Sequence, residues 1–392
     1  MTSWKTYRLG DIAKFQTGKL NSNAAVENGK YPFFTCSPNT LAIDNYAFDK
    51  EAILLAGNNA EGNFSIKYYK GKFNAYQRTY IIETYNDICD IKFLFYALKL
   101  CLQQFKLMSQ GTSTKFLTAV ILNNFEISLP SLAEQRRIAG ILGAIDDKIE
   151  NNRRINTNLE LQAQALYKQW FVDFEFPNEE GKPYKSSGGK MVDSELGPIP
   201  EEWSVKRLDD YTVIKRGGSP RPIQNYLSNT GLNWLKISDA TSTNSPFILE
   251  IKEFIKEEGL SKTVFLKKGN LVLSNSATPC IPKFLGLDTC IHDGWLYFPN
   301  AKLSKEYLYL LFKNNRQEIL SQGNGSVFLN LKTDILKSHL ICLPNCIEKM
   351  NCFNMIVKAI FKNIENCSFE IKRLATLRDT LLPKLMNGEI KL

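Results

Sequence analysis

Two stretches of the chain repeat apolar residues in heptad spacing. Steps of four and three residues connect Ile138, Leu142, Ile145, Ile149, Asn152, Asn156, Leu159, Ala163, Leu166 and Trp170. The same spacing connects Met350, Phe353, Val357, Ile360, Ile364, Cys367, Ile371, Leu374, Leu381 and Leu385, with Arg378 at the position between Leu374 and Leu381. Sustained heptads are typical of coiled-coil helices. The pattern therefore predicts two long helices packed on each other; the alternative is that each helix lies on its own domain.

Polar residues mark the start and the middle of the first predicted helix. Ser131 and Glu134 have the spacing of a capping box, which favours a helix start at this point. Asn152 and Asn156 occupy heptad positions that are otherwise apolar. Buried asparagines in such a seam fix the register of two helices at some cost in stability. The alternative is that these two side chains lie in solvent where the helices separate.

The segments that precede the two helices have the pattern of mixed blocks. Short apolar runs bounded by turn residues predict strands. These strands are Ala52–Ala56, Tyr80–Glu83 and Asn270–Leu273. One amphipathic helix is predicted in each block, at about 91–106 and 304–320. Each block closes on an apolar strand that stops at a proline, Phe125–Leu129 and Leu340–Leu343. The fold class predicted is α+β.

The two halves of the chain repeat one another. Trp4, Arg8, Leu9, Asp11 and Gly18 return 199 residues later as Trp203, Arg207, Leu208, Asp210 and Gly217. Phe93–Lys99 and Leu129-Pro130 return 214 residues later as Tyr307–Lys313 and Leu343-Pro344, and Phe116-Leu117 returns as Phe328-Leu329. The anchors keep their order in both halves. The sequence therefore predicts a tandem duplication, with a net insertion inside the second unit.

These patterns divide the chain into five segments. The first block is residues 1–131, and the first long helix is 132–176. A connector, 177–200, is rich in proline and glycine and is expected to be a linker or an extended loop. The second block is 201–345, and the second long helix lies in 346–392.

The positive charge of the chain is shared by the two blocks. The 392 residues carry 49 Lys+Arg and 40 Asp+Glu, a net charge of +9. Residues 1–131 hold 14 basic and 10 acidic side chains and residues 201–345 hold 18 and 14, so each block carries +4. Two equally charged blocks are compatible with two equivalent sites for a polyanion such as DNA.

The sequence offers little catalytic chemistry. His292 and His339 are the only histidines, which argues against histidine-based nucleophilic, acid–base or zinc chemistry. Phosphate-loop, dinucleotide and metalloprotease motifs are absent from the sequence. The spacing of His339, Cys342, Cys346 and Cys352 matches no zinc pattern. We therefore predict no catalytic residue, no metal and no cofactor on this chain.

The cysteines and the apolar segments indicate the compartment. Nine cysteines without a Cys-x-x-Cys pair are typical of reduced thiols. The chain start has no signal-peptide core, and the most apolar stretch, Phe93–Leu102, is half the length of a membrane span. We expect a soluble, cytoplasmic protein with no membrane partner.

Polar and basic side chains gather in the turns of the first block. Asn and Gln pair with adenine and Arg and Lys with guanine, whereas Ser, Thr and Lys hold phosphates. The candidates for DNA contact here are Asn58, Asn59, Asn63, Lys67, Lys72, Asn74, Tyr76, Gln77, Arg78, Thr112 and Lys115. The alternative for each residue is an ordinary polar turn.

The second block offers a corresponding set of residues. Its candidates for DNA contact are Arg216, Gly218, Ser219, Arg221, Lys236, Ser274, Asn275, Lys283, His292, Asp293, Trp295 and Asn324. Glycine lets a backbone approach a phosphate closely, which would explain the Gly217-Gly218 pair. The loops that contain Thr112 and Asn324 fall at equivalent positions of the repeat and are candidates for phosphate contact, although plain turns fit them nearly as well.

The centre of the chain resembles the specificity subunits of type I restriction–modification systems. The resemblance begins at Leu129-Pro130-Ser131-Leu132-Ala133-Glu134-Gln135-Arg136-Arg137-Ile138 and continues through Asp146-Asp147-Lys148-Ile149-Glu150 to Trp170-Phe171-Val172-Asp173-Phe174. The ending Leu381-Leu382-Pro383-Lys384-Leu385 and the connector residues Lys185–Gly189 and Glu195–Trp203 are similar to the same family. Arg216–Ile223 and Ile291–Trp295 resemble one subclass of its target-recognition domains, but the residues after Asn275-Ser276 differ from that subclass.

The resemblance implies a function for each segment. Two target-recognition domains would each read one half of a bipartite sequence in double-stranded DNA. The two long helices would form an antiparallel coiled coil that sets the spacing. Two methyltransferase subunits would dock on the helices, where Arg136, Arg137, Lys148, Arg153 and Arg154 are candidates for contact, and restriction or motor subunits would complete the complex. S-adenosylmethionine, Mg²⁺ and ATP are expected on those partners only.

Two other functions compete with this one. A coiled-coil scaffold without a DNA role would bind its partner independently of salt and sequence, whereas DNA binding weakens steeply as salt rises. A self-contained DNA-modifying enzyme would cleave or methylate DNA without partner subunits.

Overall fold

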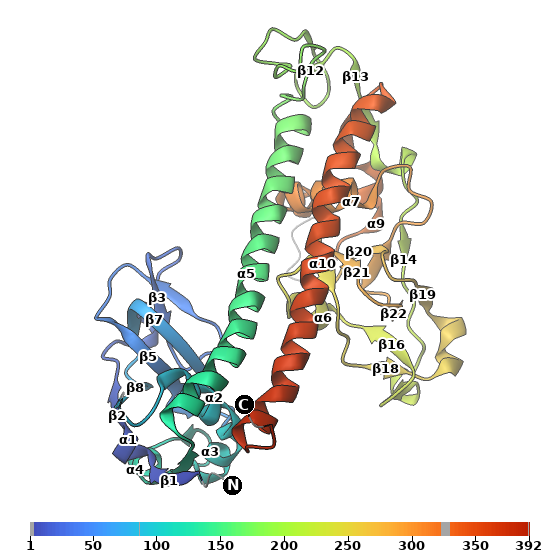
Figure 1. Ribbon diagram of the computed structural model, residues 1–392. Helices are drawn as coiled ribbons and strands as arrows, with labels where there is room; N and C mark the ends of the chain where they lie inside the picture. The colour runs from blue at the N-terminus through green and yellow to red at the C-terminus, as the bar shows by residue number, and fades with distance from the viewer. Residues whose placement is uncertain (1–3, 86, 323–329, 391) are drawn as a thin grey trace. The chain divides into compact units, whose positions relative to one another are not determined.

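The computed structural model describes residues 4–85, 87–322, 330–390 and 392. The chain forms two compact units: unit 1 is Met1–Lys148 with Leu374–Leu392, and unit 2 is Ile149–Arg373. Two helices of 40 residues each, α5 (Leu132–Phe171) and α10 (Ile347–Met386), contribute to both units (Figure 1). This division passes through both helices, so it does not test the predicted limits of the five segments. Those limits stay predictions.

Unit 1 is built on a six-stranded sheet of order β2-β8-β5-β7-β3-β4. Its strands are β2 (Ala13–Thr17), β8 (Thr79–Thr84), β5 (Phe48–Ala56), β7 (Ile66–Ala75), β3 (Tyr31–Phe34) and β4 (Leu41–Ile43). All neighbours are antiparallel except β7 and β3. Side chains alternate across the sheet: Ile53 and Leu55 pack toward the helices of the unit, and Leu54 packs on the opposite face with Phe34 and Phe73.

Three short helices cover this sheet. They are α2 (Ile91–Leu100), α3 (Leu102–Met108) and α4 (Ala119–Asn124). Asp90 caps α2, because its Oδ1 accepts a hydrogen bond of 2.9 Å from the backbone N–H of Phe93. Cys101 separates α2 from α3, so the single helix predicted at 91–106 is two helices. The first turn α1 (Leu9–Ile12) and the strand pair β1 (Lys5–Arg8) and β10 (Glu126–Leu129) complete the domain.

The same elements return in unit 2. Helices α7 (Lys305–Asn314), α8 (Arg316–Ser321) and α9 (Thr333–Ser338) each begin 214 residues after α2, α3 and α4. Ser304, 214 residues after Asp90, caps α7 by accepting from the N–H of Tyr307 at 3.1 Å. The strands β13 (Trp203–Arg207) and β24 (Leu340–Pro344) pair as β1 and β10 do. The structure thus shows the repeat in its helices and in these strand pairs, whereas the anchor Phe328-Leu329 lies outside the described residues.

The sheets of the two units share one topology. The first five-stranded sheet of unit 2 has the order β14-β23-β20-β21-β17, with all neighbours antiparallel except the last pair. Its strands are β14 (Lys215–Arg216), β23 (Trp295–Tyr297), β20 (Leu271–Ser274), β21 (Pro282–Leu285) and β17 (Phe247–Ile248). This order and these directions match β2-β8-β5-β7-β3.

Unit 2 has a second sheet that unit 1 lacks among the residues described. Its order is β15-β18-β16-β22-β19. The strands are β15 (Leu227–Ser228), β18 (Phe254–Ile255), β16 (Leu232–Leu235), β22 (Thr289–Ile291) and β19 (Val264–Leu266). The short helix α6 (Ile237–Thr241) follows β16. This sheet contains much of the extra sequence of the second half.

The long helices pair antiparallel, as predicted. In unit 2, Asn152 Nδ2 of α5 donates to Glu370 Oε2 of α10 at 2.8 Å, and Asn156 Nδ2 donates to Ser368 Oγ at 3.1 Å. The partner number falls as the α5 number rises, which is the signature of antiparallel helices. Asn152 is 1% exposed and Asn156 is 8% exposed. The two asparagines therefore lie inside the seam rather than in solvent.

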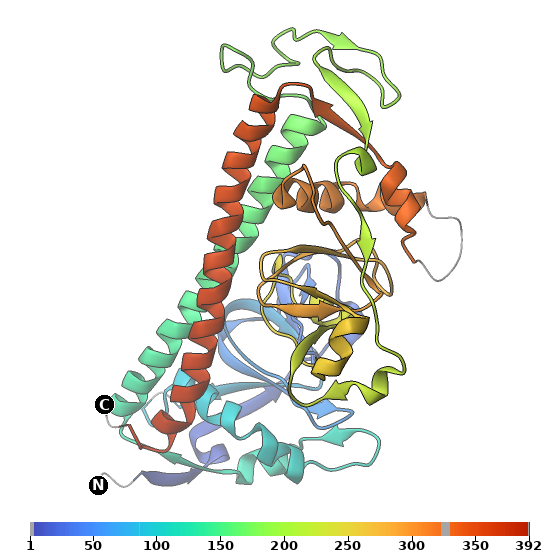
Figure 2. The same cartoon turned by 90° about the vertical axis from the view of Figure 1, so that its right-hand side faces the viewer.

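A helix of each block docks on the long helices. In unit 2, α7 lies across α5 and α10 (Figure 2), where Tyr307 contacts Phe171 with ring centres 5.0 Å apart and Tyr309 donates to Glu160 Oε1 at 2.7 Å. In unit 1, Tyr96 of α2 donates to Asp146 Oδ2 of α5 at 2.7 Å. The same helix of the repeat thus attaches each block to the long helices.

The connector is folded rather than a free linker. Phe176, 1% exposed, stacks between Trp203 and Tyr184 with ring centres 5.0 Å and 4.7 Å away. The strands β11 (Met191–Val192) and β12 (Ile199–Pro200) form a hairpin, and Ile199 is buried in the same core. The aromatic residues hold the segment against unit 2, which its proline and glycine content alone did not indicate.

We expect Asp146→Ala to lower the free energy of unfolding by about 1–3 kcal/mol. Asp146 accepts from Tyr96 and from Arg378 Nη1, 2.7 Å away in unit 1, and Arg378 is only 17% exposed, so both donors would lose a largely desolvated acceptor. Urea unfolding measures the change. Asp147→Ala, one residue away and exposed, is the control and should change stability by less than about 0.5 kcal/mol; equal effects of the two variants would contradict the role assigned to Asp146.

Candidate nucleic-acid interface

Three backbone hydrogen bonds hold the loops at one end of the sheet in unit 1. The N–H of Gly18 donates to Thr79 O at 3.3 Å, and the N–H of Gly57 donates to Arg78 O at 2.8 Å. The N–H of Leu117 then donates to Gly57 O at 2.9 Å. These bonds join four loops, residues 17–22, 57–63, 76–78 and 110–117, which we call the first loop cluster.

The same three bonds occur in unit 2. The N–H of Gly217 donates to Trp295 O at 2.9 Å, that of Asn275 to Gly294 O at 2.9 Å, and that of Leu331 to Asn275 O at 2.8 Å. They join residues 217–222, 275–280, 292–294 and 330–331, the second loop cluster. The candidate residues of the two blocks are thus carried by equivalent loops on equivalent scaffolds.

The glycines at these turns have a structural cause. A Cβ on Gly18 would lie 1.9 Å from Ala75 O, and a Cβ on Gly217 would lie 2.3 Å from His292 O, so no larger residue fits at either turn. The N–H of Gly218 donates to Ile291 O at 3.2 Å. Because the N–H groups of Gly217 and Gly218 are used within the protein, they are not available to donate to a phosphate, and a close approach of the backbone to a phosphate stays a prediction.

Asparagines shape the first loop cluster. Asn58 and Asn59 form β6 (Asn58–Asn59), which pairs with β9 (Lys115–Phe116). Asn59 Oδ1 accepts from the N–H groups of Glu61 and Asn63 at 2.9 Å and 3.0 Å. Lys106, which was not among the candidates, donates to Asn63 Oδ1 at 2.9 Å. Hydrogen bonds thus fix this turn, and the Lys106 ammonium lies against it. Lys106 belongs to the helix α3, so the sequence pattern of the loops did not indicate it.

The other candidates of unit 1 surround this turn. The Arg78 guanidinium lies 5.3 Å from the centre of the Phe116 ring, which fixes its direction, and its side chain is exposed, as is Thr112. Gln77 Nε2 donates to Asn21 Oδ1 at 2.9 Å, and Tyr76, beside it, is half-buried. Lys115 reaches the surface from β9.

Three lysine and asparagine candidates of unit 1 have internal partners. Lys67 donates to Ser37 O at 2.8 Å, and burial lowers the pKa of its ammonium. Asn74 is 4% exposed and donates to Asn45 Oδ1 at 2.9 Å. Lys72 is exposed, but it takes part in none of the loop contacts, and a hydrogen bond with Tyr46 raises its pKa. The positions of Asn74 and Lys72 therefore do not favour a place for these two residues in the interface.

Asp293 is the centre of the second loop cluster. Its Oδ1 accepts from Ser219 Oγ at 2.8 Å and its Oδ2 from Arg221 Nη2 at 3.2 Å. Its backbone carbonyl accepts from Arg216 Nε at 2.7 Å and from Asn275 Nδ2 at 3.2 Å. Burial acts to raise the pKa of Asp293, but the Ser219 hydrogen bond and the neighbouring charges outweigh it, and the pKa lies below its ordinary value.

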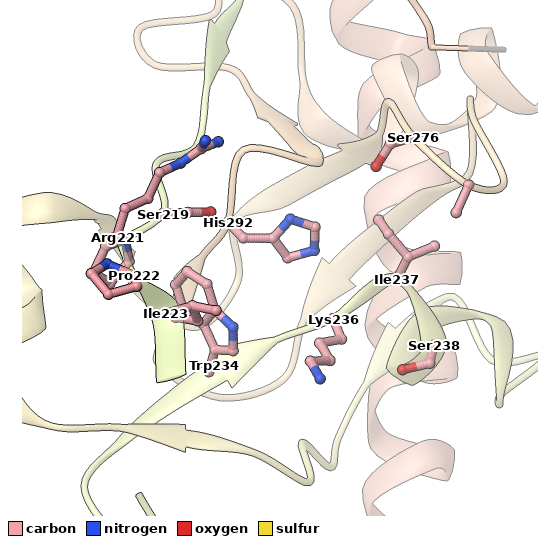
Figure 3. Close-up of a pocket in the computed structure, with 12 residues that line it drawn as sticks. Ser219, Arg221, Pro222, Ile223, Trp234, Lys236, Ile237, Ser238, Ser276 and His292 are labelled. Atoms are coloured by element: carbon pink, nitrogen blue, oxygen red, sulfur yellow. The ribbon is translucent and has the colours of Figure 1, made fainter. Parts of the chain in front are cut away.

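A pocket of about 770 Å³ opens beside this cluster. Four of the candidates line it, namely Ser219, Arg221, Lys236 and His292 (Figure 3). Trp234 lies at the end of β16, a strand of the additional sheet, and forms part of the same wall. Sequence reasoning missed Trp234, because its strand reads as an ordinary apolar core segment. The pocket combines aromatic, hydroxyl and cationic groups on fixed elements.

Four candidates of unit 2 lie inside the domain. Ser274 and Trp295 are 0% exposed and Asn275 is 1% exposed; Trp295 Nε1 donates to Leu235 O at 3.2 Å. Lys283 is 6% exposed and donates to the carbonyls of Thr243 and Ser245 at 2.8 Å and 2.6 Å. Burial lowers the pKa of Lys283 to about 8. These side chains hold the scaffold and do not favour a contact with a surface ligand.

Asn324 lies outside the described residues. Within the described ranges, no three His, Cys, Asp or Glu side chains form a group that could hold a metal ion. In the same ranges, no helix has both the length and the apolar character needed to cross a membrane. All nine cysteines are free thiols.

Residues 1–161 match the family described as the type I restriction modification DNA specificity domain. The chain is 35% identical over 226 residues to the EcoDI specificity subunit of Escherichia coli, an alignment that covers 54% of this chain and 49% of that protein. It is 26% identical to the HindI specificity subunit of Haemophilus influenzae over the full length of both chains. The chain belongs to the specificity subunits of type I restriction–modification systems.

A solved structure shows the same fold as this specificity subunit. It is the S subunit of a type I restriction–modification system from M. genitalium. The superposition has a TM-score of 0.65 at 17% sequence identity and covers 98% of this chain and 96% of that one. The predicted architecture of two mixed domains joined by long helices is confirmed.

Both histidines of this specificity subunit should make its stability depend on pH. Burial lowers the pKa of His292, opposed by Asp293 and assisted by Lys236, and burial lowers the pKa of His339, opposed by Glu318. The unfolded chain therefore takes up protons first as the pH falls below the ordinary value of 6.5. Stability is complete above that pH and is lost as the pH falls toward the lower pKa values of the folded state.

Urea unfolding at pH values from about 7.5 to 5.5 measures this loss, for which each histidine contributes at most about 1.4 kcal/mol per pH unit. A variant with His292→Gln and His339→Gln should show a much flatter dependence. An unchanged slope in that variant would show that other groups cause the effect.

Proposed function

We propose that this specificity subunit reads a bipartite sequence in double-stranded DNA, with each block acting as a target-recognition domain for one half. The observation that carries the proposal is the repeated set of loop hydrogen bonds, Gly18 to Thr79 and its companions in unit 1 and Gly217 to Trp295 and its companions in unit 2. Equivalent backbones present different side chains, such as Arg78 in one cluster and Asp293 in the other. Two related scaffolds with different surfaces suit two different half-sites.

The polar groups of the first loop cluster suit both kinds of DNA contact. Arg78 and Lys115 supply cations for phosphates or guanine, and Gln77 supplies an exposed amide for adenine. The Phe116 ring holds the Arg78 guanidinium in place, and Asn21 holds the Gln77 amide. Fixed side chains lose less conformational entropy when a ligand binds than free ones do, which favours specific recognition.

The long helices supply a spacer and a docking surface for two methyltransferase subunits. At 1.5 Å per residue, 40 residues make a helix of about 60 Å, longer than one turn of B-DNA, about 34 Å. Arg136, Arg137, Lys148, Arg153 and Arg154 are exposed on α5. The same helix exposes apolar side chains at Ile141, Ile155 and Leu161. A helix surface with both kinds of exposed group fits a protein partner.

In this proposal the subunit itself is not a catalyst. The methyltransferase subunits bind S-adenosylmethionine, and S-adenosylmethionine, Mg²⁺ and ATP are used by the partner subunits only, which include restriction or motor subunits. The complex works in the cytoplasm, where nine free thiols remain reduced. A purified chain that cleaved or methylated DNA alone would overturn this assignment.

Exchange of one block tests the modular reading. Residues 1–131 are replaced by the corresponding block of a relative with a different specificity, and the complex is produced with its methyltransferase subunits in a host. Sequencing of methylated bases should show that one half of the recognised sequence changes while the other half and the gap are retained. A change in both halves, or in neither, contradicts the proposal.

Removal of two cations in the first loop cluster should weaken DNA binding and its salt dependence. We expect Arg78→Ala with Lys115→Ala to reduce the slope of log affinity against log salt by about 1 for each phosphate that the protein no longer neutralises. The measurement is fluorescence anisotropy of the full chain with a labelled duplex at several salt concentrations. Lys72→Ala removes an exposed cation outside the cluster and serves as the control, and a slope that changes equally in both variants would exclude this surface.

A further inference from the structure

The pocket of unit 2 has a hydrogen-bond donor of fixed orientation. His292 Nδ1 accepts from the N–H of Gly294 at 2.8 Å. Asp293 Oδ1 lies 3.7 Å from the same nitrogen, beyond hydrogen-bond length. In a neutral imidazole whose Nδ1 accepts, Nε2 carries the proton. His292 therefore presents Nε2–H as a donor.

The imidazole is directed into the pocket and held there. Figure 3 shows its ring pointing toward Ile237, with Trp234 and Ser276 on either side. Among the interactions of the described residues, none engages Nε2. A Cβ on Gly294 would lie 2.2 Å from the ring carbon Cε1 of His292. Glycine at 294 thus leaves room for the ring, and the donor has no partner among the residues that the structure describes.

The walls around this donor are apolar and flat. Pro222, Ile223 and Ile237 line the pocket together with Trp234, whose ring centre is 5.9 Å from that of His292. Proline, aliphatic and aromatic surfaces suit the faces of a planar heterocycle. At the rim, Arg221 and Lys236 have side chains that are 81% and 44% exposed, although each also pairs with a carboxylate, Asp293 and Glu253.

The accessible part of the pocket wall restricts its occupant. Trp234 is 3% exposed because it packs with Ile255 and Cys290, so it supports the wall from behind, and the side chain of His292 is 19% exposed. A base stacked in a duplex offers only its edge in a groove, so it cannot place its faces against Pro222 and Ile223, which line the pocket with accessible surface. A base that has left the stack can enter such a pocket and is read there by hydrogen bonds and stacking.

We propose that this pocket holds one unpaired nucleobase of the bound DNA, with His292 Nε2–H donating to an acceptor on the base. Arg221 and Lys236 then lie beside the phosphate of the same nucleotide, where a cation is favoured. The proposal deepens the reading of unit 2 as a target-recognition domain and rests on that function.

The first test uses the full chain and the four deoxynucleoside 5′-monophosphates, with 2-deoxyribose 5-phosphate as the ligand that lacks a base. Saturation-transfer NMR should show contact to base protons of at least one nucleotide, and the sugar phosphate should bind at least about threefold more weakly. His292→Phe keeps an aromatic ring and removes the donor, so the affinity should fall about three- to tenfold, the range of one hydrogen bond. Lys206→Ala, an exposed cation on β13 outside the pocket, should leave the affinity unchanged.

The outcomes of this first test are decisive. Saturable binding that depends on His292 supports the proposal. No nucleotide binding, equal binding of the sugar phosphate, or indifference to His292→Phe overturns it. If His292→Phe fails to fold, Gly294→Ala provides a second variant, because its Cβ would displace the imidazole without removing it.

The second test uses the complete complex and a duplex of the sequence mapped by its methylation pattern. A mismatch opposite the extruded base lowers the cost of unpairing it. One position in the half-site read by unit 2 should therefore bind at least about threefold more tightly when mismatched, in the wild type but not in His292→Phe. A bipartite methylation pattern without such a position would overturn the pocket proposal alone, whereas the absence of a bipartite pattern would overturn the proposed function.

Discussion

The antiparallel seam between α5 and α10 is the constraint on which the rest of this specificity subunit depends. Apolar heptad residues such as Leu142, Ile149 and Ile364 are buried in it, and burial of this kind supplies most of the stability of a long helix. The hydrogen bonds of Asn152 with Glu370 and of Asn156 with Ser368 also favour the antiparallel direction of the two helices. A shift of one heptad would separate both hydrogen-bonded pairs, so the register is specified as well as the pairing.

The blocks are attached to the long helices by the same helix of the repeat. Tyr96 reaches Asp146 in unit 1, and Tyr309 reaches Glu160 in unit 2. Both contacts are hydrogen bonds from a largely buried phenol to a carboxylate of α5, which are stronger than bonds between neutral groups. The duplication therefore preserved the attachment of each block as well as its sheet, while the loops at the end of the sheet were free to differ.

The loop clusters show how one scaffold presents two surfaces. Backbone hydrogen bonds from Gly18, Gly57 and Leu117 in unit 1 return in unit 2, and they do not depend on side chains. Apart from Gly18 and Gly217, where no larger residue fits, the side chains of the loops can therefore change without loss of the frame. In unit 2 the additional sheet places Trp234 beside His292 and creates a pocket, which gives that cluster a chemistry different from the open, amide-rich surface around Asn59.

The sequence by itself determined the two helices, the duplication, the strands that close each block and the family. These features follow from local periodicity and from residues at fixed spacing, which need no knowledge of distant contacts. Only the tertiary structure decided which candidates reach the surface. Lys283, Asn74 and Trp295 have the residue types of a DNA reader but lie inside the domains, while Lys106 and Trp234 join the clusters from elements that read as ordinary helix and core strand. Burial and hydrogen-bond partners depend on chain segments far apart in sequence, and for that reason composition and spacing could name the loops but not the side chains that face a ligand.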